Sequence, residues 1–385
     1  MFKKFFISAA IFSAAFAVFL PFAANAQQLP ADGSVLRDPL SPKKYLMVNG
    51  AKWRIFNEFT FNQLGIKRED ILLAVRAALD EIPDGETFII RPPRFSGILD
   101  MHEHYSKGGN MKSYLDVAAK LGVSKTVFLP TGGQPDNHGY KENMAQLLEL
   151  KKQFPDRIIA FCTVDEADPD APEIFKKCLD DGGKGIKLMA GHPNFYDVPI
   201  DDEKIRALFE IANERDVPVI VHMSIINVPK IKDEFMRLMD GFPNTRLQFS
   251  HYCSTIYNGI NLDQCAEFLD KFPNMYIDLS MGGGITRYFK YLSDPASLQQ
   301  VKDFIVKYQD RILYGTDMIL ASAGPTRSSD WVRRRMMCDF SLHQDKWYRC
   351  PAINKGEYVI LQGFGLEDEI LRKMYIENPK RFLRL

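Results

Sequence analysis

Two histidines separated by one residue end a run of strand-forming residues in "SGILDMHEHYSKGG" (96–109). Alternate residues of a strand point to the same side, so the side chains of His102 and His104 are expected to project together. Such a pair can hold a metal ion, although one core histidine beside one surface histidine gives the same spacing. The positions of the other histidines have to decide between these interpretations.

Short apolar segments alternate with amphipathic helical stretches from residue 97 onward. Eight of them read as strands: GILDMH (97–102), KTVFLP (125–130), RIIAFCTV (157–164), KGIKLMA (184–190), VPVIVHMS (217–224), RLQFSHYC (246–253), MYIDLSM (275–281) and RILYGTD (311–317). Near-continuously apolar strands between helices indicate a parallel sheet covered by helices. Eight such units predict an α/β fold, a (β/α)₈ TIM barrel, which typically has ~250 residues. A doubly wound sheet is the competitor, but no glycine-rich nucleotide loop follows the first strand.

Polar side chains stand at the ends of these strands. His222 ends the fifth strand, His251 the sixth and Asp317 the eighth, and Lys187 lies in the fourth. The carboxyl ends of barrel strands meet at one mouth, where active sites form. Imidazoles and a carboxylate at an open mouth are a catalytic donor set for a divalent metal, which lowers the pKa of a coordinated water to ~7. The sequence therefore predicts hydrolysis of an ester, lactone or amide.

The same positions carry a family resemblance over about residues 97–385. The motifs are Asp100-x-His102-x-His104, Gly185-Ile-Lys187, Val221-His222, Ser250-His251, Asp278-Leu-Ser280, Gly315-Thr-Asp317 and the terminal YIENPKRFLRL. They resemble the amidohydrolase superfamily, in particular its amidohydrolase-related (amidohydrolase 2) branch of metal-dependent hydrolases and decarboxylases.

The resemblance implies roles for individual residues. His102, His104, His222 and Asp317 would hold the metal, with zinc the favoured ion. One ion is expected, or two if Lys187 is carbamylated and bridges them; an ion pair inside the barrel is the other role for this lysine. Asp317 and His251 would be catalytic: Asp317 moves the proton of the attacking water, and His251 contacts that water or the substrate carbonyl. Non-oxidative decarboxylation by the same ligands is the alternative activity.

Other polar residues are weaker candidates. Glu103 points away from its neighbouring histidines, so no catalytic role is expected. His138 and His192 follow strands at the mouth, where His192 is a candidate substrate contact and His138 is a surface histidine or a second contact. His343 is expected to be exposed.

A long insertion, 318–364, follows the eighth strand and is rich in arginine and aromatic residues. It is expected to cover part of the mouth, with Arg327 binding an anionic or carbonyl-rich substrate, because a guanidinium pairs with carboxylates. The alternative is that the arginines at 333–335 mostly face solvent and do no more than that.

The N-terminal part is expected to be separate from the barrel. Lys3 and Lys4, an apolar run and Ala24-Asn25-Ala26 predict a signal peptide over 1–26 and a periplasmic or secreted protein, with an uncleaved anchor as the rival. Residues 27–95 are expected to form an extension that packs on the barrel, with a helix in 67–85, and residues 96–385 the barrel itself.

Composition limits the partners. Hydrophobic residues make up 46% of the 385-residue chain and the formal net charge is zero. Nucleic acids and anionic membranes attract a basic excess, so neither is expected as a partner, and no stable membrane association is expected after signal cleavage. The expected partner is a small-molecule substrate; whether the protein forms a homo-oligomer stays open.

Six cysteines could form disulfides in an oxidising compartment. Cys338 and Cys350 lie in one polar, aromatic segment and are the predicted pair. The other four are expected either to pair or to be buried thiols.

Overall fold

A computed structural model describes residues 29–55, 67–85, 92–131, 139–192, 198–223, 229–254, 262–280, 292, 295–324, 328–351 and 358–385. The chain divides into two compact units, one formed by the described residues up to 85 and the other by those from 92 onward. No helix in these ranges is long and apolar enough to cross a membrane. The predicted signal peptide and its cleavage site lie outside the described residues.

The first unit is a small sheet with strand order β3-β2-β1-β4. Its elements are β1 (Val35–Arg37), β2 (Lys44–Val48), β3 (Ala51–Ile55), β4 (Leu72–Leu73) and α2 (Arg76–Glu81). The helix expected in 67–85 is wrong in extent, because Leu72 and Leu73 pair in parallel with β1 and only 76–81 are α-helical. The prediction that the extension packs on the barrel stays a prediction.

The second unit contains the predicted strands, most of them shorter than expected. They are β5 (Ile98–Tyr105), β6 (Val123–Pro130), β7 (Ile158–Ala160), β8 (Cys162–Thr163), β9 (Ile186–Leu188), β10 (Val219–Val221), β11 (Leu247–Phe249), β12 (Met275–Asp278) and β13 (Ile312–Leu313). A short strand that was not predicted, β14 (Ile319–Leu320), follows them. All the pairs between them are parallel. Several strands end before the residues that form the site, so His222, His251 and Asp317 lie in the segments that leave the strands.

The strands form two sheets, with orders β13-β12-β11-β10-β9-β8 and β14-β5-β6-β7. The third predicted strand links them, because its two halves β7 and β8 belong to different sheets. Backbone hydrogen bonds also join the eighth strand to the first: Met101 N donates to Tyr314 O (2.9 Å) and Asp317 N donates to His102 O (2.7 Å). The eighth and first strands are therefore neighbours, as a barrel requires.

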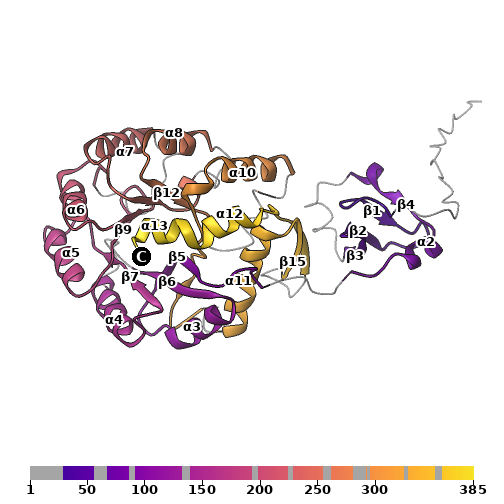
Figure 1. The fold of residues 1–385 in the computed structure, drawn as a ribbon, viewed down its shortest axis with the longest axis horizontal. Coiled ribbons are helices and arrows are strands. Elements are labelled where there is room, and N and C mark those ends of the chain that lie inside the picture. Colours follow the sequence, from indigo (N-terminus) through magenta and orange to yellow (C-terminus); the bar gives the residue numbers. More distant parts are fainter. Residues whose placement is uncertain are drawn as a thin grey trace, which may run out of the picture. The chain divides into compact units, whose positions relative to one another are not determined.

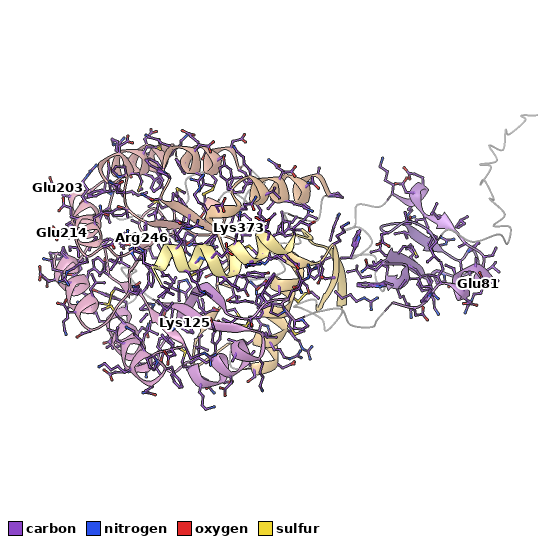
Figure 2. All side chains as sticks on the ribbon, in the orientation of Figure 1. Glu81, Lys125, Glu203, Glu214, Arg246 and Lys373 are labelled. Atoms are coloured by element: carbon purple, nitrogen blue, oxygen red, sulfur yellow. A yellow bond between two sulfur atoms is a disulfide. The ribbon has the colours of Figure 1, made fainter. Side chains whose placement is uncertain are left out.

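Helices surround the strands (Figure 1). They are α3 (Met111–Lys120), α4 (Tyr140–Gln153), α5 (Ala171–Asp180), α6 (Glu203–Glu214), α7 (Pro229–Gly241), α8 (Asp263–Lys271) and α10 (Pro295–Lys307). Side chains accept backbone N–H groups at the starts of two of them: Asn110 from Ser113 N (3.1 Å) and Asp202 from Lys204 N (3.0 Å). Glu203 and Glu214 mark the exposed side of α6, whose apolar side is buried (Figure 2).

Inward-facing strand residues fill the space that the strands enclose. Leu99, Met101, Val127, Leu129, Ile159, Phe161, Ile220, Tyr276 and Leu313 form one buried cluster with Phe382 and Leu383. The last two belong to α13 (Asn378–Leu383), which follows α12 (Asp368–Arg372) in the C-terminal segment that crosses the strands in Figure 1. The C-terminal helix therefore completes the core at the side opposite the site residues.

The segment after the eighth strand forms α11 (Ser329–Gln344) and the antiparallel pair β15 (Trp347–Pro351) and β16 (Tyr358–Gln362). Helix α11 lies beside α3, and the hydroxyls of Ser113 and Ser329 are 2.7 Å apart. It therefore belongs to the outer helix layer, so the expected cover over the mouth is not formed by α11. Arg327 lies outside the described residues, so its predicted substrate contact stays a prediction.

The expectation that His343 is exposed is wrong, and the expectation that the arginines at 333–335 mostly face solvent holds for two of the three. His343 is 1% exposed and lies among the rings of Tyr314, Phe364 and Tyr375. Arg335 is also buried, because it pairs with Asp339 (3.3 Å) and donates to Thr316 O (3.1 Å) on the barrel side. Only the other two arginines of the run face solvent. Arg335 and Asp339 are four residues apart, so both lie on the inward face of α11 and are buried together.

All six cysteines are paired. The predicted Cys338–Cys350 disulfide is confirmed. Of the two expectations for the other four cysteines, pairing is the one found, in Cys162–Cys178 and Cys253–Cys265. The first joins β8 to α5, and the second joins the segment after His251 to α8.

Candidate metal centre

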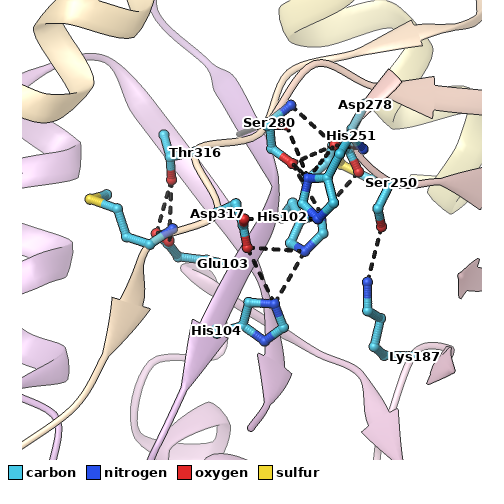
Figure 3. A network of polar contacts seen from close by, with 12 residues as sticks. His102, Glu103, His104, Lys187, Ser250, His251, Asp278, Ser280, Thr316 and Asp317 are labelled. Atoms are coloured by element: carbon cyan, nitrogen blue, oxygen red, sulfur yellow. Dashed lines mark hydrogen bonds and ion pairs between the residues drawn. The ribbon is translucent and has the colours of Figure 1, made fainter. Parts of the chain in front are cut away.

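Three potential ligand atoms meet where the first and eighth strands end. His102 Nε2 lies 3.3 Å from His104 Nε2, and Asp317 Oδ1 lies 3.4 Å and 3.3 Å from these two nitrogens (Figure 3). The two histidines project from one side of β5, as the strand period predicts. Asp317 reaches them because its backbone N–H bonds to His102 O.

The donor set fits a divalent cation. His102 Nδ1 lies 2.9 Å from Asp278 Oδ2 and carries the proton of that hydrogen bond, so Nε2 presents a lone pair toward Asp317. A lone pair and a carboxylate oxygen that face each other need a cation or a proton between them. The spacing also suits zinc, because ligands about 2.0 Å from a tetrahedral centre lie about 3.3 Å apart. The cluster can hold such an ion with its two imidazoles and one carboxylate.

Asp278 orients His102 from behind. Its carboxylate also accepts hydrogen bonds from Gln248 Nε2 (2.7 Å), His251 N (3.1 Å) and Ser280 N (3.1 Å). Although burial acts to raise the pKa of Asp278, the adjacent His102 and the other donors hold it well below the usual range. An ionised carboxylate that fixes the tautomer of a ligand histidine is typical of metal sites.

Asp317 has a left-handed backbone conformation (φ 51°), which is unusual for a residue with a side chain. The residues on both sides of it are tied to carboxyl groups of β5. Thr316 Oγ1 lies 2.8 Å from Asp100 Oδ2 and 2.9 Å from Glu103 Oε1, and Met318 N donates to Glu103 (3.0 Å). Glu103 thus points away from the histidines, as predicted, and holds the turn that carries Asp317.

The Thr316 hydroxyl lies between the carboxyl groups of Asp100 and Glu103 and forms a hydrogen bond with each of them. A hydroxyl has one hydrogen, so it can donate to only one of the two acids, and the other acid donates to it. Burial raises the pKa of Asp100 to about 7 and that of Glu103 well above its ordinary value. For Asp317 burial acts in the same direction, but His251, His102 and His104 outweigh it and hold its pKa well below the ordinary value.

His251 lies next to the cluster and is fixed by the end of the seventh strand. Its ring stacks on that of His102 at 4.8 Å between centroids. Nδ1 lies 3.0 Å from the carbonyl oxygen of Ser280, which can only accept, and 2.9 Å from the hydroxyl oxygen of Ser280, which donates its own hydrogen to Asp278, so the Nδ1 proton is directed to Ser280. Nε2 then faces Asp317 Oδ2 at 3.8 Å.

The imidazoles form a row that leads away from the ligand cluster. Ring centroids are separated by 5.2 Å (His104 to His102), 4.8 Å (His102 to His251), 4.7 Å (His251 to His222) and 4.5 Å (His222 to His192). Burial lowers the pKa of His192 to about 4 and that of His222 well below the ordinary value. Within the described residues the ring of His222 contacts that of His251 and is not among the three closest ligand atoms, so its predicted role as a metal ligand stays a prediction.

Lys187 lies buried beside this row. Its Nζ donates a hydrogen bond to Ser250 Oγ (3.0 Å), the residue before His251. Burial lowers the pKa of Lys187 to about 8, against the opposing effect of Asp278 and Asp317. The hydroxyl of Ser250 thus links Lys187 to the residue next to His251.

Two groups of residues have roles that the sequence analysis did not assign: Asp278, and the set of Asp100, Glu103 and Thr316. Asp278 could have been found, because it lies in the Asp278-Leu-Ser280 motif, where the seventh strand ends. The acidic pair gave no comparable signal, since its role depends on contacts with a turn more than 200 residues away. His138 lies outside the described residues.

The strand arrangement and the His-His-Asp cluster define an α/β barrel protein with a candidate metal site. A family model described as Amidohydrolase matches residues 99–385, and the chain belongs to this family, whose members are metal-dependent enzymes. The predicted (β/α)₈ fold and the family resemblance are thereby confirmed.

Solved structures show similarity in fold. A protein from Acinetobacter baumannii assigned as a 2-pyrone-4,6-dicarboxylic acid hydrolase, with citric acid bound, has a TM-score of 0.51 at 11% identity, over 75% of this chain and 100% of that one. A protein from Pseudomonas putida with the same assignment has a TM-score of 0.50 at 13% identity, over 75% and 97%. The 2,6-dihydroxybenzoate decarboxylase from Rhizobium has a TM-score of 0.47 at 15% identity, over 75% and 99%. No curated protein matches the chain.

Proposed function

We propose that this protein is an exported metal-dependent hydrolase that cleaves an ester, lactone or amide bond in a small molecule. The observation that carries the proposal is the meeting of His102 Nε2, His104 Nε2 and Asp317 Oδ1 within 3.4 Å of one another, beside the ring of His251. Hydrolases of this kind need a ligand set that leaves room for water, together with a group that moves a proton.

A divalent ion held by these ligands would act as a Lewis acid toward water and toward a substrate carbonyl. Asp317 directs Oδ1 to the two histidines and Oδ2 to His251 Nε2. We therefore assign to Oδ2 the transfer of a proton from the attacking water to the leaving group.

His251 supports the same reaction through Nε2, because Nδ1 is engaged by Ser280. The neutral ring presents a lone pair that can accept a proton, and the protonated ring donates a hydrogen bond to a developing oxyanion. We assign His192 to the wall along which the substrate lies, since its ring continues the row from His251 through His222, and His222 stays the proposed fourth metal ligand. Arg327 stays the proposed contact for an anionic group of the substrate.

Zinc is the ion we propose, because imidazoles and a carboxylate with an open position are a donor set of catalytic zinc. One ion per chain is expected, and a second would require carbamylation of Lys187. Export is supported by the three disulfides, which persist in oxidising compartments.

The test is to incubate the zinc-loaded protein with a panel of esters, lactones, amides and aromatic carboxylates, and to measure acid release and carbon dioxide release separately. The matched variants are Asp317→Asn and Asp303→Asn, the latter on the exposed side of α10. Acid release that falls about 100-fold or more in Asp317→Asn, and is unchanged in Asp303→Asn, supports the proposal. Carbon dioxide release without acid release would identify the decarboxylase alternative, and no turnover by fully metal-loaded protein would contradict both.

A further inference from the structure

The segment after the sixth strand has an unusual backbone. His251, Tyr252, Cys253 and Ser254 have φ values of 58°, 54°, 55° and 56°. Residues other than glycine adopt this left-handed conformation rarely and as single residues, because Cβ approaches the carbonyl oxygen. Four in succession therefore need contacts that hold them in place.

Hydrogen bonds hold both ends of this turn. At its start His251 N donates to Asp278 Oδ1 (3.1 Å), and at its end Ser254 N donates to His251 O (2.8 Å). The second bond is local and moves with the turn. Neither of these two bonds attaches Cys253 to the rest of the protein.

A disulfide makes that attachment. Cys253, 0% exposed, is bonded to Cys265 in α8, and the two Cα atoms are 5.7 Å apart. Helix α8 is itself fixed on the barrel, because Phe268 packs against Phe235 and Phe249 (centroid distances 4.9 Å and 6.4 Å). Since Phe249 ends the strand that leads to His251, the disulfide ties the turn to a helix fixed on that strand.

We propose that the Cys253–Cys265 disulfide is a positioning element that keeps the left-handed turn, and with it the imidazole of His251, in place beside the metal ligands. The proposal rests on the role proposed for His251. Without the disulfide the turn relaxes toward ordinary backbone conformations, which moves His251 Nδ1 away from Ser280. His102, His104 and Asp317 belong to other strands and keep their positions.

Three double variants of the full chain separate this role from a general effect of losing a disulfide. Cys253→Ala/Cys265→Ala removes the bond. Cys253→Gly/Cys265→Ala also removes it, but glycine adopts the left-handed conformation without steric cost. The matched control is Cys162→Ala/Cys178→Ala, which removes an equally buried disulfide between β8 and α5.

The main readout is the imidazole NMR signal of His251, with ¹⁵N-histidine labelling and assignment by His251→Asn. We expect the Nδ1–H signal of the bond to Ser280 to be lost in the alanine pair, restored in the glycine pair and kept in the control. Thermal unfolding should rank the glycine pair above the alanine pair, the reverse of the usual effect of glycine. Zinc content should be the same in all three variants.

An alanine pair with an unchanged His251 signal would overturn the proposal, as would a control that loses the signal to the same extent. If the alanine pair fails to fold, the glycine pair decides: a native His251 signal supports the proposal and its absence overturns it. None of these readouts needs turnover, so failure of the proposed hydrolase activity is distinguishable from failure of this inference.

Discussion

Replacing His343 should change the pH dependence of stability. This imidazole is buried among aromatic rings, and its Nδ1 lies 3.3 Å from the Tyr375 hydroxyl. Burial lowers its pKa from 6.5 to about 3. The folded protein therefore keeps the ring neutral at a pH where the unfolded chain binds a proton, so stability is full above pH 6.5 and falls as the pH decreases toward the lower pKa.

The magnitude follows from these two pKa values. Below 6.5 the unfolded state gains about 1.4 kcal/mol for each pH unit through this one proton. At pH 5 the loss is about 2 kcal/mol, and at pH 7 it is roughly 0.2 kcal/mol. His343→Asn removes the titration while its amide still meets the Tyr375 hydroxyl. The packing lost in the variant lowers its free energy of unfolding by the same amount at every pH. The difference in free energy of unfolding between the parent and the variant should therefore shrink by about 2 kcal/mol between pH 7 and pH 5.

The assay is urea unfolding of both proteins at pH 5, 6 and 7. Phe340→Leu is the matched control, because Phe340 belongs to the same aromatic cluster and does not titrate. It should lower stability equally at every pH. If the free energy of unfolding of His343→Asn is lower than that of the parent by the same amount at all three pH values, burial does not keep the imidazole neutral and the reasoning fails.

Further predictions concern the site and export. His104→Ala should abolish stoichiometric zinc binding, measured by metal analysis after dialysis; the same measurement on His222→Ala tests the fourth ligand, and unchanged zinc there would refute that assignment. Glu103→Ala should lower the free energy of unfolding by about 1–3 kcal/mol, because Met318 N–H loses its acceptor, whereas Glu103→Gln keeps an acceptor and should stay within about 1 kcal/mol of the parent in urea unfolding. N-terminal sequencing of exported protein should begin at Gln27; a chain that retains its first residues would indicate an uncleaved anchor.

The sequence was sufficient for the fold and for the centre of the site. His102 and His104 could be paired because strand residues two apart share a side, and Asp317 could be brought to them because the ends of barrel strands meet. Both inferences use periodicity and topology, which depend on backbone geometry alone. The resulting ligand atoms lie within 3.4 Å of one another.

Features that depend on packing between distant segments could not be read in this way. His343 belongs to the same helix as the exposed Arg333 and Arg334, and the rings that bury it, Tyr314, Phe364 and Tyr375, come from other segments. The pairing of Cys253 with Cys265 was likewise open, since spacing does not fix disulfide connectivity. In both cases the missing information is which surfaces meet.

The two residues proposed to act on the substrate share a further property that periodicity conceals. Asp317 and His251 both stand where a strand ends and both have positive φ values, 51° and 58°. An extended backbone would send successive side chains to alternate sides, whereas a left-handed residue turns the chain and brings its side chain toward the neighbouring strand. Each turn is held by a different set of contacts: hydrogen bonds to the carboxyl groups of Asp100 and Glu103 in β5 for Asp317, and a disulfide to α8 for His251. Because the two sets of contacts are independent, damage to one should displace one catalytic group and leave the other in place.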